Sequence, residues 1–174
     1  MSIRLFFANK PPTELRLAIA EFGARLCRAH RLEGSLVDAG RLHVTLAAAW
    51  AEHLSLPEAI WRAQTLAMTV RAARLPVCFD FTGSFRGAGR HPFVLRGSEE
   101  LVELAGFRDR LRAAMQRSGF AVSSGFTPHM TLMWADRCVE DYPIAPISWQ
   151  VRDFELVLSA DGDHIQLGRW PLTS

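Results

Sequence analysis

The spacing of apolar residues predicts a chain in which short strands alternate with three amphipathic helices. Short apolar runs flanked by turn-forming residues are typical of strands, and they cover residues 3–8, 41–50, 75–81, 93–95, 129–134, 151–159 and 165–167. Apolar residues spaced by three and four predict helices, and these cover residues 13–29, a segment from Pro57 to about Val70, and residues 98–118. Residues 34–40, the glycine-rich segment 83–89 and a turn at 161–163 are expected to be loops.

The order of these elements repeats once along the chain. A strand, a helix and a loop precede residues 42–46, which are Leu-His-Val-Thr-Leu. The same three elements precede residues 128–132, which are Pro-His-Met-Thr-Leu. The unit is too long for a solenoid repeat. We therefore expect two similar lobes that pack around a cleft, with one His-x-Thr-Leu strand from each lobe.

Composition limits the classes of protein that this chain can form. It has 174 residues, of which 49% are apolar and 22% are charged, and its net charge is +2. This length suits one domain, or two small lobes that share a core, and the apolar content excludes an intrinsically disordered protein. The charge is too balanced for a protein that coats DNA without specificity, whereas a local basic cleft is compatible with it.

The cysteines and the N-terminal segment indicate the cytoplasm. Cys27, Cys78 and Cys138 are far apart and form no Cys-x-x-Cys pair, which argues against a disulfide framework and a zinc knuckle. Arg4 interrupts the short apolar run at the N-terminus, so no signal peptide is expected. No stretch is long and apolar enough for a transmembrane helix. We expect a cytoplasmic monomer without a membrane association or an obligate protein partner.

The two repeated motifs carry the candidate chemistry. Residues i and i+2 of a strand point to the same face, so His43 and Thr45 project together, as do His129 and Thr131. Two facing imidazoles suit an in-line displacement at phosphorus, because the neutral one can accept a proton while the protonated one donates. The threonine hydroxyls can hydrogen-bond to the non-bridging phosphate oxygens. This chemistry needs no metal and no cofactor.

Other interpretations of the histidines are weaker. A single His-x-Thr in a strand is more often a half-buried structural histidine, but two copies in equivalent halves favour catalysis. A metal site on His43 and His129 would be incomplete, because no acidic or cysteine ligand stands at regular spacing from either one. His30 is expected to be solvated. Strand alternation places Trp134 on the face opposite His129, unless a β-bulge intervenes.

Several longer strings resemble one known family. They are Arg-Leu-Phe-Phe-Ala at residues 4–8, the two motifs, and the closing Trp-Pro-Leu at 170–172. The most specific string is Phe-Thr-Pro-His-Met-Thr-Leu at 126–132. Over essentially its whole length the chain resembles the 2H phosphoesterase superfamily, and within it the RNA 2′,3′-cyclic phosphodiesterases, historically called 2′–5′ RNA ligases.

The resemblance implies a fold and an activity. The fold is a bilobal α+β domain over residues 1–174, with antiparallel sheets lining a central cleft and helices outside. The activity is hydrolysis of a terminal 2′,3′-cyclic phosphate on RNA to a 2′-phosphate, with joining or cleavage of 2′–5′ linkages as a related reaction. His43 and His129 become the acid/base pair, and Thr45 and Thr131 bind the phosphate. Partners would be RNA ends or nucleotides with a 2′,3′-cyclic phosphate.

The sequence departs from this family in places that bear on the substrate. Members often carry an arginine five residues after the second histidine, where this chain has Trp134, and the nearest arginine is Arg137. Arg137 and Arg90 are therefore candidates for substrate contact. His164 stands where a tyrosine is common. Two alternatives follow: a phosphodiesterase for a small cyclic nucleotide or ADP-ribose derivative, and a non-catalytic module that binds RNA ends.

Overall fold

A computed structural model describes residues 4–49, 52–86, 89–98, 101–123, 125, 127–160 and 163–173. The helices in this part of the chain are α1 (Thr13–Ala29), α2 (Leu56–Ala67) and α3 (Val102–Arg117), with a 3-10 turn at Ala39–Arg41. The strands are β1 (Arg4–Asn9), β2 (Gly34–Leu36), β3 (Val44–Ala48), β4 (Leu75–Ser84), β5 (His91–Arg96), β6 (His129–Ala135), β7 (Tyr142–Val151), β8 (Asp153–Ala160) and β9 (Asp163–Pro171).

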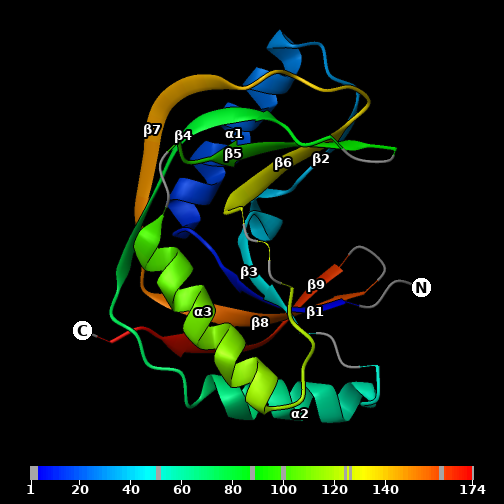
Figure 1. The fold of residues 1–174 in the computed structure, drawn as a ribbon. Helices are drawn as coiled ribbons and strands as arrows, with labels where there is room; N and C mark the ends of the chain where they lie inside the picture. Colours follow the sequence, from blue (N-terminus) through cyan, green and yellow to red (C-terminus); the bar gives the residue numbers. More distant parts are fainter. Residues whose placement is uncertain are drawn as a thin grey trace.

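The strands form two antiparallel halves that meet at the repeated motifs. One half has the order β7-β4-β5-β6, with β2 added to β6, and the other has the order β3-β1-β8-β9 (Figure 1). The halves are joined between β3 and β6 by one register pair, Val44 with Met130. The predicted α+β fold with antiparallel sheets and outer helices is therefore confirmed, and both His-x-Thr strands lie at its centre.

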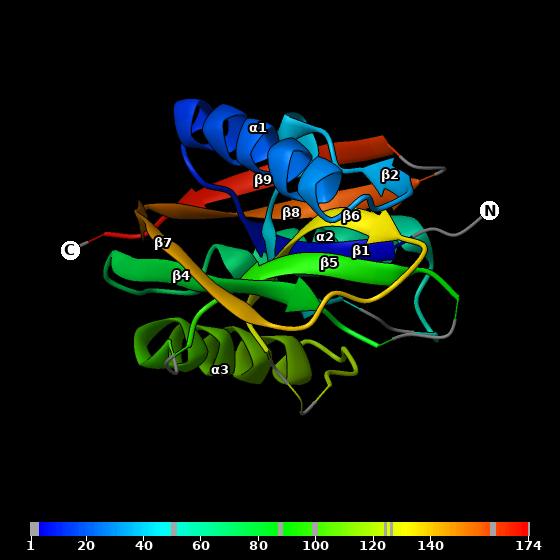
Figure 2. The same ribbon diagram turned by 90° about the horizontal axis from the view of Figure 1, so that it is seen from above.

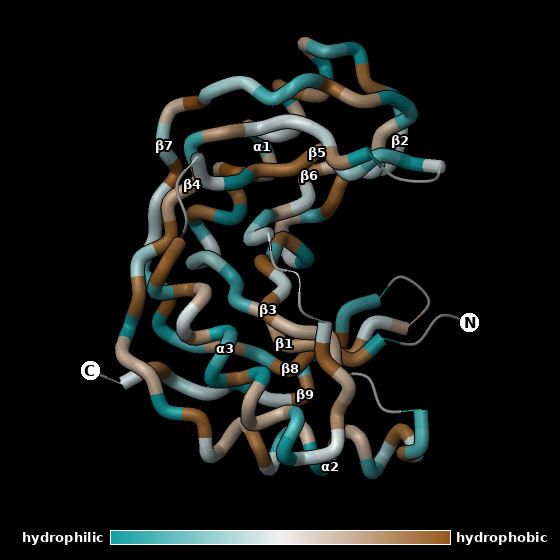
Figure 3. Tube along the Cα trace, in the orientation of Figure 1, coloured by the Kyte–Doolittle hydropathy of each residue, from teal (hydrophilic) through white to brown (hydrophobic). Residues whose placement is uncertain are grey.

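The helices α1 and α3 lie on opposite sides of the strands (Figure 2). A Cβ on Gly23 of α1 would come within 3.3 Å of the Leu132 side chain of β6, so this helix packs closely on the second motif strand. Phe107 of α3 meets Phe154 of β8 edge-on at 5.3 Å. The inner strands β5 and β6 are mostly hydrophobic, whereas the helices mix both kinds of residue (Figure 3), as expected for helices that cover a sheet.

A β-bulge occurs at the same place in both motif strands. In the pairing of β1 with β3, Phe7 lies opposite Ala47 but Ala8 lies opposite Thr45, so the register skips Leu46. In the pairing of β5 with β6, Phe93 lies opposite Met133 but Val94 lies opposite Thr131, so the register skips Leu132. Leu46 and Leu132 are therefore the extra residues of their strands. A bulge of this kind shifts the alternation of faces by one position. As a result, the residue three places after each motif threonine returns to the face of that threonine.

The structure adds two strands that the sequence pattern did not predict. β7 contains Pro143 and Pro146, which argue against a central strand, but it lies at the edge of the sheet and pairs with β4, where proline is tolerated. β2 occupies part of the expected loop 34–40 and pairs with β6. The expected strand 151–159 is interrupted at Arg152, and residues 161–162 of the expected turn lie outside the described residues.

Helices α1 and α3 agree with their predicted positions within a few residues, and α2 begins at Leu56 behind a Ser55 cap that accepts from the Glu58 amide at 3.4 Å. Among the residues that the structure describes, none of the helices is long and apolar enough to cross a membrane.

Candidate active site

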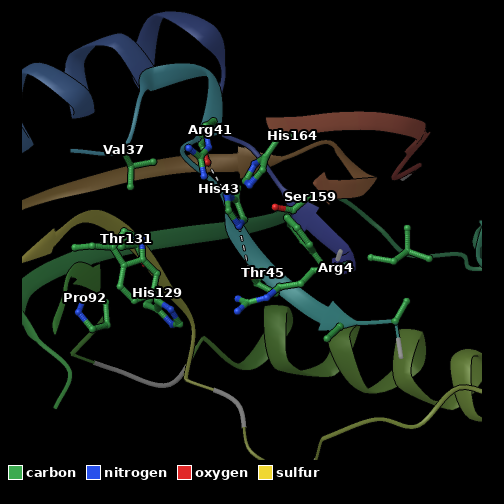
Figure 4. Close-up of a pocket in the computed structure, with 15 residues that line it drawn as sticks. Arg4, Val37, Arg41, His43, Thr45, Pro92, His129, Thr131, Ser159 and His164 are labelled. Atoms are coloured by element: carbon green, nitrogen blue, oxygen red, sulfur yellow. Dashed lines mark hydrogen bonds between the residues drawn. The ribbon is translucent and has the colours of Figure 1, made fainter. Parts of the chain in front are cut away.

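A cleft of about 850 Å³ lies where the two halves meet. All four motif residues line it: His43 and Thr45 from the β3 side, and His129 and Thr131 from β6. Figure 4 shows these side chains facing the same space from the two strands. The predicted convergence of the two His-x-Thr motifs on one surface is therefore present in the structure.

Each imidazole is oriented by a hydrogen bond from Nδ1 to the backbone carbonyl two residues earlier. His43 Nδ1 lies 2.6 Å from the carbonyl oxygen of Arg41, and His129 Nδ1 lies 2.7 Å from that of Thr127. A carbonyl can only accept, so Nδ1 carries the proton in each ring. The other nitrogen, Nε2, is then the atom available for proton exchange with a ligand. In His43 it lies 3.1 Å from Thr45 Oγ1, which donates to it.

His43 has a crowded and partly apolar environment. Its ring stacks on Phe6 at a centroid distance of 5.1 Å and meets His164 edge-on at 5.3 Å. Burial lowers the pKa of His43 to about 4; the hydrogen bond to the Arg41 carbonyl opposes this, and the charges of His164, Lys10 and His129 add to it. His43 is therefore neutral near pH 7, the state that a general base requires.

His129 has a different set of neighbours. Its ring meets Phe85 edge-on at 4.9 Å, and its side chain is half-buried. The segment that leads into it is held by Arg108 of α3, whose guanidinium donates to the carbonyls of Ser123 at 3.1 Å and Gly125 at 2.7 Å.

Arg108 also reaches the other motif. Its Nε donates to the carbonyl oxygen of Leu46 in β3 at 3.2 Å, and the residue is only 3% exposed. One buried side chain thus connects the strand of His43 to the segment before His129. Because a buried cation is held in place by its hydrogen bonds, Arg108 links the backbone of β3 to the segment before β6.

The cleft also contains charged residues that the sequence pattern did not single out as site residues. Arg4 and Arg41 line it on the β3 side, together with Ser159 and His164. Arg41 stands two residues before His43, and this nearness to the motif was the signal that could have found it. Arg4 begins β1, and the pairing of β1 with β3 brings that strand beside the first motif. Burial, followed by the charges of Arg41 and Lys10, lowers the pKa of His164.

Two arginines that were expected near the substrate lie elsewhere. Arg90 donates to Ser35 Oγ at 2.8 Å on the exposed surface. Arg137 donates to the carbonyls of His30 and Arg31 at 2.6 and 2.5 Å, and so closes the C-terminal end of α1. Neither is among the described residues that line the cleft. A substrate contact by either one stays a prediction.

The exception allowed for Trp134 applies: the bulge at Leu132 returns this residue from the face opposite His129 to the cleft face, where it is 44% exposed. His30 was expected to be solvated, but its Nε2 lies 2.8 Å from the Tyr142 hydroxyl. In the described part of the chain no three side chains of His, Cys, Asp or Glu are grouped to hold a metal ion.

Comparison with known proteins gives a family and several similar structures. Residues 11–172 match the family model of the 2′-5′ RNA ligase superfamily. None of the curated proteins compared with the sequence matches it. Escherichia coli LigT complexed with 3′-AMP is 29% identical, with a TM-score of 0.80 and 98% of each chain covered. A crystal structure described as a phosphoesterase is 27% identical, with a TM-score of 0.79 over 99% of this chain and 100% of that one.

Proposed function

The chain belongs to the 2′-5′ RNA ligase superfamily of 2H phosphoesterases, and on this premise we propose that it hydrolyses terminal 2′,3′-cyclic phosphates on RNA to 2′-phosphates. One observation carries the proposal. Two imidazoles from equivalent strands face one cleft, each with Nδ1 fixed by a carbonyl and Nε2 available to a ligand. This is the arrangement that an in-line displacement at phosphorus requires.

The different environments of the two histidines suggest a role for each. His43, neutral near pH 7, takes a proton from the attacking water at Nε2. His129, in its protonated form, donates to the departing ribose oxygen. A bond forms between the water oxygen and phosphorus, the bond from phosphorus to O3′ breaks, and the products are a 2′-phosphate and a 3′-hydroxyl.

The threonines complete the proposed site. Thr45 donates to His43 Nε2 in the structure, so its hydroxyl must turn to the phosphate when the substrate binds. That rotation leaves Nε2 free to receive the proton from water. Thr131, on the opposite strand, donates to a second non-bridging oxygen. Both bonds strengthen as charge accumulates in the transition state.

Arg4 and Arg41 favour RNA over a small uncharged ester as the substrate. Their side chains line the cleft next to His43, where a further phosphate of the chain can pair with a guanidinium. Similar structures agree with a nucleotide ligand, because Escherichia coli LigT has been crystallised with 3′-AMP, with ATP and with NADP+. A second RNA strand that attacks through its 5′-hydroxyl in place of water would form a 2′–5′ linkage by the same chemistry.

A second candidate is a phosphodiesterase for a small cyclic nucleotide. A cleft of about 850 Å³ is within the range of sites for single small molecules, so one nucleotide can fill it. Comparison of kcat/KM for a cyclic mononucleotide and for a short RNA with the same terminus separates the two candidates. We expect the RNA to be preferred because of the two arginines.

The test of the proposed function is a product analysis. A short RNA with a 2′,3′-cyclic phosphate terminus is incubated with the protein in EDTA, and 2′- and 3′-phosphate products are resolved. We expect the 2′-phosphate alone. A 3′-phosphate product, or turnover that EDTA abolishes and zinc or manganese restores, contradicts the proposal, and binding without turnover identifies a module that only holds RNA ends.

A further inference from the structure

One wall of the cleft is apolar and has no part in the proton transfers. Trp134 is 44% exposed and lines the same cavity as both histidines. Pro92, its partner across β5 and β6, lines the cavity beside it, as does Val37. A large aromatic ring that faces water inside a concave site gains hydrophobic free energy when a flat apolar ligand covers it.

The backbone holds this ring firmly in the cleft. The β6 strand is paired on both sides at Trp134, with Ser35 of β2 and with Pro92 of β5. The bulge at Leu132 is what directs the residue to the face of Thr131. A ring on a doubly paired strand is a better preorganised platform than one on a loop, because less conformational entropy is lost when a ligand binds.

The opposite motif has no such ring. The residue three places after Thr45, behind the same bulge, is Ala48, and it also lines the cleft. That side carries the guanidinium groups of Arg4 and Arg41, and its Phe6 ring, which also lines the cleft, is only 8% exposed and already stacks on His43. A ligand with one flat aromatic part and one anionic part therefore has a single favourable orientation, with its aromatic part on Trp134.

A nucleotide is a ligand of this kind. Resting on the proposed function, we propose that Trp134 is the platform on which the nucleobase of the cyclic-phosphate nucleotide stacks, so that the enzyme selects base-bearing substrates and accepts any base. Stacking on an aromatic ring tolerates every base because each one presents a π-face. Selection by Trp134 thus acts on the presence of a base and is nearly independent of its identity.

A binding experiment tests this without turnover. Adenosine 3′-phosphate and ribose 3-phosphate are titrated by calorimetry into the wild type, Trp134→Ala, Trp134→Phe and the control Trp61→Ala, whose ring is 65% exposed on α2. We expect Trp134→Ala to weaken the nucleotide about 10- to 100-fold and to leave ribose 3-phosphate unchanged. Trp134→Phe should retain most of the affinity, and Trp61→Ala all of it.

Kinetics then separate this inference from the proposed function. With 2′,3′-cyclic AMP, Trp134→Ala should raise KM and leave kcat within a few-fold of the wild-type value. The uridine, cytidine and guanosine 2′,3′-cyclic phosphates should show a similar rise in KM, because stacking tolerates every base. In one outcome the wild type turns over no cyclic phosphate, while Trp134→Ala still weakens the binding of adenosine 3′-phosphate and not that of ribose 3-phosphate. That result contradicts the proposed function but supports Trp134 as the base-stacking residue. Equal binding of adenosine 3′-phosphate and ribose 3-phosphate by the wild type, or equal weakening of both by Trp134→Ala, overturns the platform.

Discussion

The strands β3 and β6 contain the same motif, the same bulge and the same carbonyl bond to Nδ1, yet their histidines have different surroundings. His43 stacks on Phe6, touches His164 and has a pKa of about 4. His129 is half-buried like His43, but its ring meets Phe85 edge-on. Duplicated backbone geometry can therefore place two equivalent groups, while the side chains packed around each group differ.

The largest expected effect comes from removing either imidazole. His43→Ala and His129→Ala should each lower kcat about 10²- to 10⁴-fold with the short RNA substrate. The double variant should lose little more than the worse single one, because the two groups act in one step. Circular dichroism and Tm show whether each variant is folded. Near wild-type turnover by either folded variant removes that histidine from the mechanism.

The next largest loss of activity should come from replacing Arg108, whose side chain bonds to both motif segments. Arg108→Met leaves the carbonyls of Leu46, Ser123 and Gly125 without their donor, which costs about 1–3 kcal/mol of folding free energy for each buried acceptor that water cannot reach. Displacement of one imidazole by about 1 Å can lower kcat about 100-fold.

The matched control for Arg108 is on the same helix. Arg110→Met changes an exposed guanidinium of α3, so kcat and Tm should change little. A loss of stability in Arg108→Met without any loss of kcat would show that Arg108 does not position the histidines.

A smaller loss is expected from the motif hydroxyls. Thr45→Val and Thr131→Val keep the shape of each side chain and remove one donor to the phosphate, so kcat/KM should fall about 10- to 100-fold. Thr65→Val on α2, whose hydroxyl bonds to the Trp61 carbonyl, is the control. Equal activity of the Thr45 variant and the wild type would mean that this hydroxyl serves only His43.

The smallest expected change is a shift in the pH dependence of kcat/KM when His164, a neighbour of His43, is replaced. In His164→Phe a bulky ring stays next to His43, but the titratable imidazole and its charge are lost. Burial, the main cause of the low pKa of His43, is kept, while the repulsion from His164 is removed. The pKa of His43 should therefore rise, and the acid limb of kcat/KM should move to higher pH. A limb that stays in place excludes electrostatic coupling between His164 and His43.

Local sequence was sufficient to predict the helices, the duplicated motifs and their convergence on one cleft. It could not settle the face of Trp134, because face alternation assumes unbroken pairing, and the bulge at Leu132 depends on a partner strand far away in the sequence. It missed β7 because Pro143 and Pro146 are acceptable only at an edge, and the strand order decides which strands are edges.

The difference between the histidines was also invisible in the sequence. His43 and His129 stand in nearly identical strings, and the groups that bury His43 come from other strands, Phe6 from β1 and His164 from β9. Only their packing shows that one imidazole is desolvated among positive groups. A motif therefore identifies the candidate reacting atoms, whereas their tertiary neighbours influence their protonation states.

The most direct test of this account is the pH dependence of kcat/KM for the wild type, measured in EDTA with a short RNA that ends in a 2′,3′-cyclic phosphate. His43 must be neutral to act as a base, so the rate should fall as the pH falls through about 4, and it should fall again at alkaline pH because general acid catalysis needs a protonated donor. His43→Gln should lose the acid limb from any residual rate. A wild-type rate that rises steadily into alkaline pH would contradict a mechanism based on two differentiated histidines.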